Sequence, residues 1–368
     1  SLAAAPPAPR PEWPAPAPAD LAMLMYSSGT TGRPKGAIVT HGSWVAQTTR
    51  ALGELPPIGL GDVVLAVAPM SHFGGSIGLD CAVRGAATVT MPHFDARAVL
   101  EAVETFGVTV LPLAPIMLER VARAAGGAAR APHGVRSVPY GGSPIGAEAL
   151  ELAECVFPGA LTQFYGLAEA LAPLTVLSPA DHASGVPGRL GSAGRPVTGV
   201  ALRLVGEEIV VRADTVTTGY WNRPELTAEV LREGWFHTGD LARVDADGYV
   251  HLVGRSSEMI VTGGFNVYPA EVERVIARVD GVREAAVVGM PHPVWGEGVT
   301  AAVVLDDGRR TGTPGEDVLA AIAHACAAAL ADYKKPVAVH AVPGIPRNAA
   351  GKTDRKTLRQ TLSDREEH

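Results

Sequence analysis

The chain has 368 residues, of which 47% are hydrophobic and 19% are charged, which is typical of a folded globular protein and excludes a long disordered chain. That length is enough for two or three domains with a sizeable core. The 31 basic and 38 acidic residues give a formal net charge of −7, so we expect no nucleic-acid partner, and no apolar run is long enough to predict a membrane partner. Cys81, Cys155 and Cys326 are scattered without a CxxC pair, which argues against a metal site or a disulfide framework and fits a reducing cytoplasm.

Residues 1–20 are rich in proline and alanine and are predicted to form an extended linker. Linkers usually follow a folded part, and this chain begins at Ser1. We therefore expect that an N-terminal portion was removed, is not represented in this chain, or is naturally missing. If it is absent, strands near Val63 and Val108 would expose edges and apolar faces unless a partner covers them.

The next part of the chain, to about Leu177, alternates short apolar runs with helical patterns. Residues 63–68 are predicted as a buried strand, and Asp95 as the N-cap of a helix that ends at Gly107. Residues 108–113 are predicted as a strand and residues 115–125 as a helix. Alternation at this spacing predicts a parallel α/β sheet.

From about Gly194 to Arg255 the pattern changes to hairpins without long helices. Strands are predicted at residues 200–205, 209–212, 241–244 and 249–253, and an Asp-Gly turn at residues 247–248 joins the last two. This arrangement favours a small β-barrel or an antiparallel sheet. Trp235 and the segment Gly219-Tyr220-Trp221 are expected to pack in the core.

The pattern changes again beyond Ser256–Ser257, where we place a domain boundary. Predicted helices cover residues 270–279 and 315–331, and predicted strands cover residues 285–289, 300–305 and 337–342. The sequence therefore predicts a linker at residues 1–20, a large domain at 21–255 with a β-barrel-like subdomain at 194–255, and a small α+β domain at 256–368.

The segment from Tyr26 to Gly36, YSSGTTGRPKG, combines glycines, hydroxyls and a lysine in one loop after the apolar run Leu21 to Met25. Glycines allow backbone N–H groups to surround an oxyanion, hydroxyls add donors, and Lys35 supplies the opposite charge. The spacing is not that of a Walker A loop. By itself the segment is also compatible with an ordinary polar turn.

Five further segments place polar residues where a plain scaffold would not need them. They are YGGSP at 140–144, QFYGLAE at 163–169, HTGD at 237–240, Gly254-Arg255 with MIVTGGFNVYP at 259–269, and PRNAAGK at 346–352. In this order the six segments resemble the adenylate-forming superfamily of acyl-CoA synthetases, peptide-synthetase adenylation domains and luciferases, and this chain is most like an acyl-CoA ligase that lacks its N-terminal portion. The resemblance extends from Leu21 to about Leu358.

The resemblance implies an α/β fold: a large domain with parallel α/β sheet layers and a β-barrel-like subdomain, followed by a small mobile α+β domain. It also implies two half-reactions. A carboxylate and ATP would form acyl-AMP and pyrophosphate, and a thiol would then attack the acyl-AMP after the small domain has rotated. The implied cofactors are ATP/AMP, Mg²⁺ and coenzyme A.

The resemblance further implies a role for each matching residue. The β- and γ-phosphates would be held by Ser27, Ser28, Gly29, Thr30, Thr31, Gly32 and Lys35. The rest of the nucleotide would be contacted by Gly141, Gly142, Ser143, Tyr165, Gly166, Asp240 and Arg255, with Tyr165 stacked on adenine and Asp240 bound to the ribose hydroxyls. Glu169 would bind Mg²⁺, and Lys352 would reach the carboxylate and the α-phosphate. Gly263 and Gly264 would line the thiol tunnel, and the acyl pocket would include His72, Gly74, Leu167 and Ala168.

Structural alternatives remain for several of these residues. His72 is equally compatible with a core histidine, Glu169 with a turn cap, Asp240 with the end of a strand, and Gly263-Gly264 with a simple turn. Ala168 stands where many members carry a threonine, whose hydroxyl would contact the α-phosphate. Losing one hydrogen bond to a charged group costs about 1.5–3 kcal/mol, which would slow adenylation without abolishing it.

The expected substrate is an apolar aliphatic or aryl carboxylic acid, because the residues that would shape the pocket are small or apolar. CoA is expected as the thiol rather than a carrier protein, because no carrier domain follows Lys352 before His368. Three hypotheses remain: a complete acyl-CoA ligase, a half-reaction enzyme that mainly transfers a supplied acyl-AMP to CoA, and a non-catalytic nucleotide-binding remnant. The charged residues favour the first, whereas Ala168 and the absent N-terminal portion motivate the second.

Overall fold

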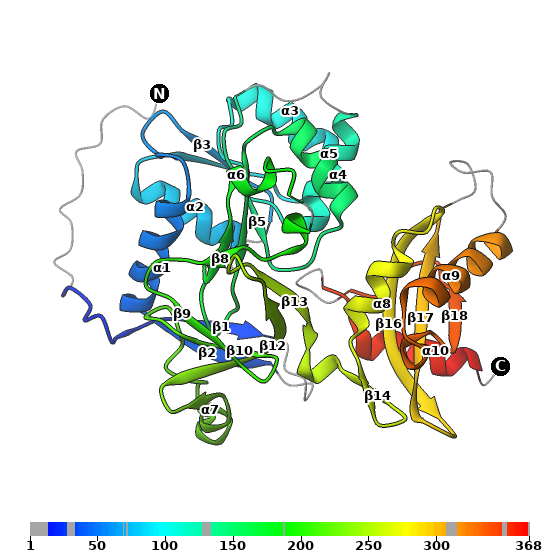
Figure 1. The fold of residues 1–368 in the computed structure, drawn as a ribbon. Coiled ribbons are helices and arrows are strands. Elements are labelled where there is room, and N and C mark those ends of the chain that lie inside the picture. The colour runs from blue at the N-terminus through cyan, green and yellow to red at the C-terminus, as the bar shows by residue number, and fades with distance from the viewer. Residues whose placement is uncertain are drawn as a thin grey trace.

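A computed structural model describes residues 14–27, 34–68, 70, 73–126, 134–186, 188–306, 315–347 and 352–366. Most of the predicted linker, residues 28–33 of the predicted phosphate loop, His72, and residues 348–351 before Lys352 lie outside this part of the chain. No helix of the described part is long and apolar enough to cross a bilayer. The described residues form a large and a small body, and the chain passes from one to the other near residue 256 (Figure 1).

The large body begins with a hairpin that brackets the predicted phosphate loop. Strands β1 (Leu21–Ser27) and β2 (Lys35–Thr40) pair antiparallel, with Ser27 opposite Lys35. Thr40 and Ser43 then form a capping box, which satisfies the first N–H groups of α1 (His41–Glu54). The apolar run before the loop is therefore a strand, and the two ends of the loop are held together.

The parallel sheet predicted for residues 21 to about 177 is confirmed between residues 63 and 165, whereas the pairing is antiparallel before and after that range. Strand β3 pairs in parallel with β4, and on its other side Val64 pairs with Val110. Val110 and Leu113 then pair with Ser137 and Tyr140, which leads to β5 and its parallel neighbour β6, followed by the antiparallel β7 and β8. The strands are β3 (Val63–Ala66), β4 (Ala87–Thr90), β5 (Val138–Gly141), β6 (Leu161–Tyr165), β7 (Thr175–Leu177) and β8 (Arg195–Pro196).

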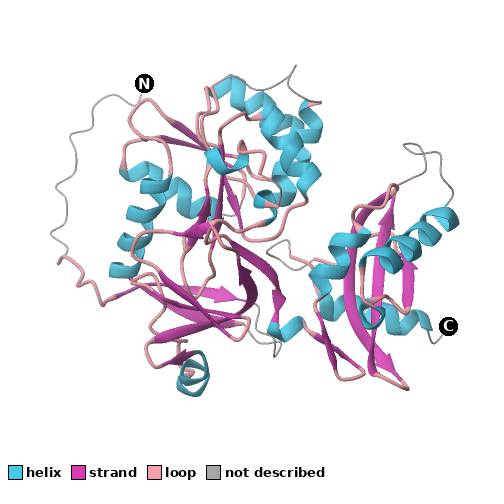
Figure 2. Cartoon of the chain, viewed as in Figure 1, coloured by secondary structure: helices cyan, strands magenta, loops and turns pink. Residues whose placement is uncertain are grey.

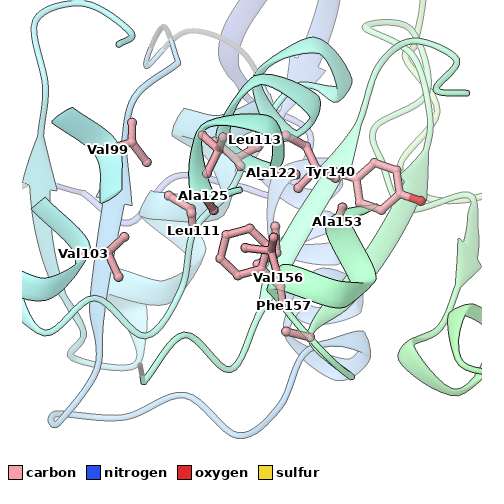
Figure 3. Packing of buried hydrophobic residues seen from close by; sticks show 14 of the residues in the cluster. Val99, Val103, Leu111, Leu113, Ala122, Ala125, Tyr140, Ala153, Val156 and Phe157 are labelled. Carbon is pink, nitrogen blue, oxygen red and sulfur yellow. The ribbon is translucent and has the colours of Figure 1, made fainter. Parts of the chain in front are cut away.

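Helices pack against this sheet and form the main core (Figures 1 and 3). Asp95 caps the first turn of α3 through N–H groups of Arg97 and Ala98, and Gly107 ends the helix in the left-handed region, as predicted. The core is built from buried side chains of the helices and strands, among them Val103, Leu113 and Phe157. The helices are α2 (Phe73–Val83), α3 (Ala96–Phe106), α4 (Pro115–Ala125), α5 (Ala147–Val156) and the short α6 (Pro179–His182).

The expected exposure of strand edges near Val63 and Val108 is wrong. Both segments lie inside the sheet, where Val64 and Val108 are fully buried. The outer strand of the described part is β4, and three of its four residues are exposed. The pairing of β3 with β4 could not be read from the chain, because β4 is short and has no buried face of its own.

The antiparallel subdomain is a five-stranded sheet in the order β11-β12-β10-β9, with β13 paired to β12. Strand β12 is the longest, and its pairing with β13 places Asp240 opposite Arg255. The elements are β9 (Ala201–Val205), β10 (Glu208–Arg212), α7 (Pro224–Val230), β11 (Leu231–Arg232), β12 (Trp235–Val244) and β13 (Val250–Arg255).

The small body is a sheet with helices on both faces (Figure 2). Its strand order is β15-β14-β17-β16, and β18 pairs in parallel with β17. Apolar residues of α8 and α9 cover one face, and Leu358 and Leu362 of α10 cover the other. The elements are η3 (Ser256–Glu258), β14 (Ile260–Thr262), β15 (Phe265–Val267), α8 (Pro269–Ile276), β16 (Val282–His292), β17 (Gly296–Leu305), α9 (Gly315–Ala329), η4 (Asp332–Lys334), β18 (Ala338–Ala341) and α10 (Arg355–Glu366).

Candidate active site

The centre of the candidate site is a buried carboxylate held by two partners. Asp240 Oδ1 lies 2.8 Å from Arg255 Nε, and Oδ2 accepts a hydrogen bond of 2.8 Å from the hydroxyl of Tyr165. Asp240 is only 5% exposed. Three elements meet here, because β12 and β13 place Asp240 and Arg255 in register and Tyr165 ends β6. Each carboxylate oxygen has a second lone pair, so Asp240 can still accept hydrogen bonds from a ligand.

The protonation states of this cluster follow from burial and charge. Burial, and then the charge of Asp240, raise the pKa of Tyr165 well above its ordinary value, so its hydroxyl stays a donor. Asp240 also raises the pKa of Arg255, which therefore stays a cation. The prediction that Tyr165 offers its ring to adenine is untested, and its hydroxyl is committed to Asp240.

A second carboxylate, Glu169, lies in the turn that follows β6. Glu169 is 9% exposed, and its Oε1 accepts a hydrogen bond of 2.9 Å from the Tyr220 hydroxyl. Its backbone carbonyl accepts from the N–H of Thr217 at 2.7 Å. The Lys35 ammonium lies 5.0 Å from the centre of the Tyr220 ring, within cation–π range. Tyr220 therefore links the lysine at the end of the predicted phosphate loop to the predicted magnesium ligand.

The sequence analysis missed this role of Tyr220. The expectation of burial is right for Tyr220, which is 5% exposed, but wrong for Trp221, which is 48% exposed. Backbone bonds from Ile38 N to Gly219 O and from Trp221 N to Gly36 O attach this segment to β2. Nothing in the sequence signals that attachment, because it joins residues about 180 positions apart.

Lys352 lies just before α10 of the small body. Its pKa is lowered, mainly through desolvation and then through the charge of Arg255. Asp240 and Glu169 act in the opposite direction and raise the pKa. Charged groups of the large body therefore influence the protonation of Lys352.

The predicted glycine positions have different reasons to be glycine. A Cβ on Gly141 would lie 2.2 Å from the carbonyl oxygen of Phe164, and one on Gly166 would lie 2.6 Å from Ala172 Cα. Gly142 has a φ of 92°. Close backbone packing therefore requires glycine at positions 141 and 166, whereas the left-handed backbone favours it at position 142.

The remaining predicted residues fall into three groups. Gly74 lies buried in the first turn of α2, whereas Leu167 and Ala168 are half-buried in the turn before Glu169. Gly263 and Gly264 form the turn between β14 and β15 with positive φ angles, so their turn role is visible and a tunnel role stays a prediction. Six predicted residues lie outside the described part of the chain: Ser28, Gly29, Thr30, Thr31, Gly32 and His72.

A magnesium ion fits the donor set that is present. Within the described ranges, no group of three or more histidine, cysteine, aspartate and glutamate side chains is arranged to hold a metal. Mg²⁺ in nucleotide sites typically uses one or two carboxylates together with substrate phosphates and waters. The carboxylate of Glu169, beside Tyr220 and Lys35, has the chemistry for such a contact.

Comparison with known proteins identifies the family. The AMP-binding enzyme family matches residues 2–221, and the AMP-binding enzyme C-terminal domain matches residues 271–352. The chain is 38% identical over 348 residues to a feruloyl-CoA synthase of Amycolatopsis sp, covering 90% of this chain and 68% of that protein.

Solved structures agree with this assignment. The structure of the amide bond synthetase McbA from Marinactinospora thermotolerans superposes with a TM-score of 0.83 at 32% identity, covering 93% of this chain and 70% of that one. The O-succinylbenzoate coenzyme A synthetase MenE from Bacillus subtilis, in complex with ATP and a magnesium ion, gives a TM-score of 0.80 at 29% identity, with 94% and 71% covered.

The chain belongs to the AMP-binding enzyme family. Within that family it is an ATP-dependent acid–thiol ligase of the acyl-CoA synthetase kind, with the large N-terminal and small C-terminal domains typical of adenylate-forming enzymes.

Proposed function

We propose that this enzyme activates an apolar aliphatic or aryl carboxylic acid with ATP and transfers the acyl group to the thiol of coenzyme A. The observation that carries the proposal is the buried cluster of Asp240, Arg255 and Tyr165 in the large domain. The charges of Asp240, Arg255 and Glu169 also act on Lys352 of the small domain. Asp240 can accept hydrogen bonds from the hydroxyls of a nucleotide, and the two cations suit its phosphates and a reacting carboxylate. Two similar proteins, a feruloyl-CoA synthase and an O-succinylbenzoate coenzyme A synthetase, are named for aryl acids, and this supports an aryl acid as the substrate.

In the first half-reaction a carboxylate oxygen attacks the α-phosphorus of ATP, and the bond from that phosphorus to the pyrophosphate oxygen breaks. Lys352 supplies positive charge where the attacking carboxylate and the α-phosphate meet. Asp240 accepts hydrogen bonds from the ribose, and Tyr165 and Arg255 hold Asp240 in place. Lys35 neutralises the departing phosphates. Mg²⁺, when bound at Glu169, would add to that neutralisation.

In the second half-reaction the CoA sulfur attacks the acyl carbon and its proton passes to solvent. The bond from the acyl carbon to the phosphate oxygen breaks, and AMP leaves with that electron pair. A thiol needs a path to the acyl carbon that Lys352 does not block, so we propose that the small domain rotates between the steps. The turn at Gly263-Gly264 is the segment of the small domain that we propose lines the thiol path.

The experiment that tests the proposal is pyrophosphate release with ATP, Mg²⁺ and a panel of carboxylic acids, with and without CoA. Acid-dependent release followed by CoA-dependent thioester formation is the expected result. Because a similar structure belongs to an amide bond synthetase, amines are included as alternative acceptors. Amide formation without thioester formation would contradict CoA as the acceptor.

The half-reaction enzyme remains the second candidate because Ala168 offers no hydroxyl beside Glu169. It predicts thioester formation from synthetic acyl-AMP and CoA, together with little pyrophosphate release for every acid tested. A folded protein that performs neither step and only binds nucleotide would instead support the non-catalytic alternative.

A further inference from the structure

A buried polar network lies behind the ends of β5 and β6. The hydroxyl of Tyr140 is 2.8 Å from Nε2 of His182 and 3.1 Å from Oε1 of Gln163. Tyr140 is fully buried and His182 is 5% exposed. In Figure 3 the Tyr140 hydroxyl points away from the labelled apolar side chains. The ring of Tyr140 thus packs in the apolar core, whereas its hydroxyl makes polar contacts outside that core.

The hydrogen-bond partners define where the protons lie. Nδ1 of His182 is 2.7 Å from the backbone oxygen of Ser178, which can only accept, so Nδ1 carries the proton. Burial lowers the pKa of His182, which favours the neutral ring and leaves Nε2 as an acceptor. Tyr140 then donates to Nε2. Oε1 of Gln163, at 3.1 Å, is a second acceptor within reach of the same hydroxyl proton.

The network spans residues that lead directly into the candidate site. Tyr140 and Gln163 lie opposite each other in the β5–β6 register. Tyr140 is followed by Gly141, whose backbone packs against Phe164 with no space for a side chain. Gln163 is two residues before Tyr165, which holds Asp240. A shift of the Tyr140 ring would therefore move both strand ends.

The helix that carries His182 is itself fixed from the opposite side. Ser178 and Asp181 form a capping box on α6, and Asp181 Oδ1 accepts a hydrogen bond of 2.5 Å from Tyr249. Tyr249 directly precedes β13, the strand that ends in Arg255. Hydrogen bonds on both sides of α6 therefore hold His182 beside Tyr140.

We propose that Tyr140 and His182 are positioning residues of the nucleotide site, because their hydrogen bond sets the strand ends that present Gly141, Gly142 and Tyr165. The inference rests on the proposed function, since those residues are the proposed nucleotide contacts. Neither side chain touches the ligand itself: both are buried, and the Tyr140 oxygen is occupied by Gln163 and His182.

The test is AMP and ATP binding by calorimetry, together with thermal unfolding, for Tyr140→Phe, His182→Leu and His182→Gln. We expect Tyr140→Phe and His182→Leu to weaken AMP binding about fivefold to tenfold, the size expected when one buried hydrogen bond is lost. His182→Gln retains an acceptor for Tyr140 and should bind AMP more tightly than His182→Leu.

Thr48→Val is the matched control, because it removes a part-buried hydroxyl hydrogen bond to Asp80 that joins α1 to α2 and is no part of the Tyr140–His182 network. It should lower the melting temperature while AMP affinity stays within about twofold of the parent. AMP affinities for Tyr140→Phe and His182→Leu equal to that of Thr48→Val at similar melting temperatures would overturn the inference. If the parent itself binds neither AMP nor ATP, the proposed function fails, and this inference fails with it.

Discussion

Among the site residues, Lys352 is the one whose substitution should distinguish the two half-reactions most clearly. Its pKa is lowered by desolvation and by Arg255, yet Asp240 and Glu169 keep a cation favourable at this position. Lys352→Ala should reduce acid-dependent pyrophosphate release by about a hundredfold or more, because it removes positive charge where the acid meets the α-phosphate.

The same Lys352→Ala variant should retain most of its CoA transfer from synthetic acyl-AMP, because the thiol step does not require the lysine. The two rates are compared in the same preparation, with Lys356→Ala as a control on the neighbouring helix. Equal losses in both steps would contradict the assigned role of Lys352.

Tyr220 provides a second test at the level of a single residue. Tyr220→Phe keeps the ring beside Lys35 but removes the hydroxyl that donates to Glu169. A hydrogen bond to a charged group contributes about 1.5–3 kcal/mol, so we expect adenylation to fall roughly tenfold and the Mg²⁺ concentration for half-maximal rate to change. Trp221→Phe, at an exposed neighbour, is the control. If the Mg²⁺ dependence of the rate were unchanged, the assignment of Glu169 as the Mg²⁺ ligand would be contradicted.

Ala168→Thr tests the departure from the family pattern. The added hydroxyl would provide the phosphate contact that the alanine lacks, and we expect acyl-AMP formation to rise about threefold to tenfold. The measurement is single-turnover acyl-AMP formation with saturating ATP. A lower rate with an unchanged melting temperature would show that this turn is adapted to alanine.

Among the elements, the start of β3 depends on Asp62. Its carboxylate accepts from Arg136 Nη2 at 2.6 Å, from Thr109 Oγ1 and from the N–H of Gly59, which joins three segments of the parallel sheet. Burial by itself would raise the pKa of Asp62, but the hydrogen bonds from Arg136, Thr109 and Gly59 outweigh it, and the pKa is lowered. The folded state therefore favours the ionised carboxylate.

A lowered pKa in the folded state gives stability that is fully present above the ordinary aspartate value and is lost as the pH falls through the folded value. Asp62→Asn should lower the free energy of unfolding by about 1–3 kcal/mol at pH 7, and the difference from the parent should shrink as the pH falls below about 4. Denaturant titrations between pH 3 and 7, compared with Asp247→Asn at an exposed turn, measure this. A difference independent of pH would exclude the ionised carboxylate as its cause.

Individual elements were largely predictable because their signals are local. The cap at Asp95 and the left-handed Gly107 define the two ends of α3, about three turns apart, and both are confirmed. The partners of β3 were not predictable, because strand order depends on pairing with residues such as Val110, and the sequence around Val110 does not indicate which strand it pairs with.

At the scale of the whole molecule, a hydrogen bond between two side chains joins the two bodies directly. The hydroxyl of Tyr268, on the small body, donates to Glu207 Oε2 in the β9–β10 turn at 2.7 Å. Desolvation and then Glu207 raise the pKa of Tyr268 to about 12, so the hydroxyl remains a donor at neutral pH. We expect this contact to favour the domain arrangement seen here, in which we propose that Lys352 acts.

Tyr268→Phe should therefore slow adenylation by about twofold to fivefold, as expected for a contact near the surface, and should leave thioester formation from acyl-AMP unchanged or faster. The ratio of the two rates is the measurement, and Glu207→Gln should change it in the same direction. A ratio equal to that of the parent would show that the bond does not favour either arrangement.

The sequence by itself determined the family, the order of the polar segments and most helices and strands, because these depend on residue types at short spacing. Only the tertiary structure decided that Tyr220 contacts Glu169, that Tyr140 contacts His182, and which strands are internal. Such contacts join residues tens of positions apart, and packing of the folded chain selects them. The local sequence gives the chemical groups, whereas contacts between distant groups form only when the chain folds around its core.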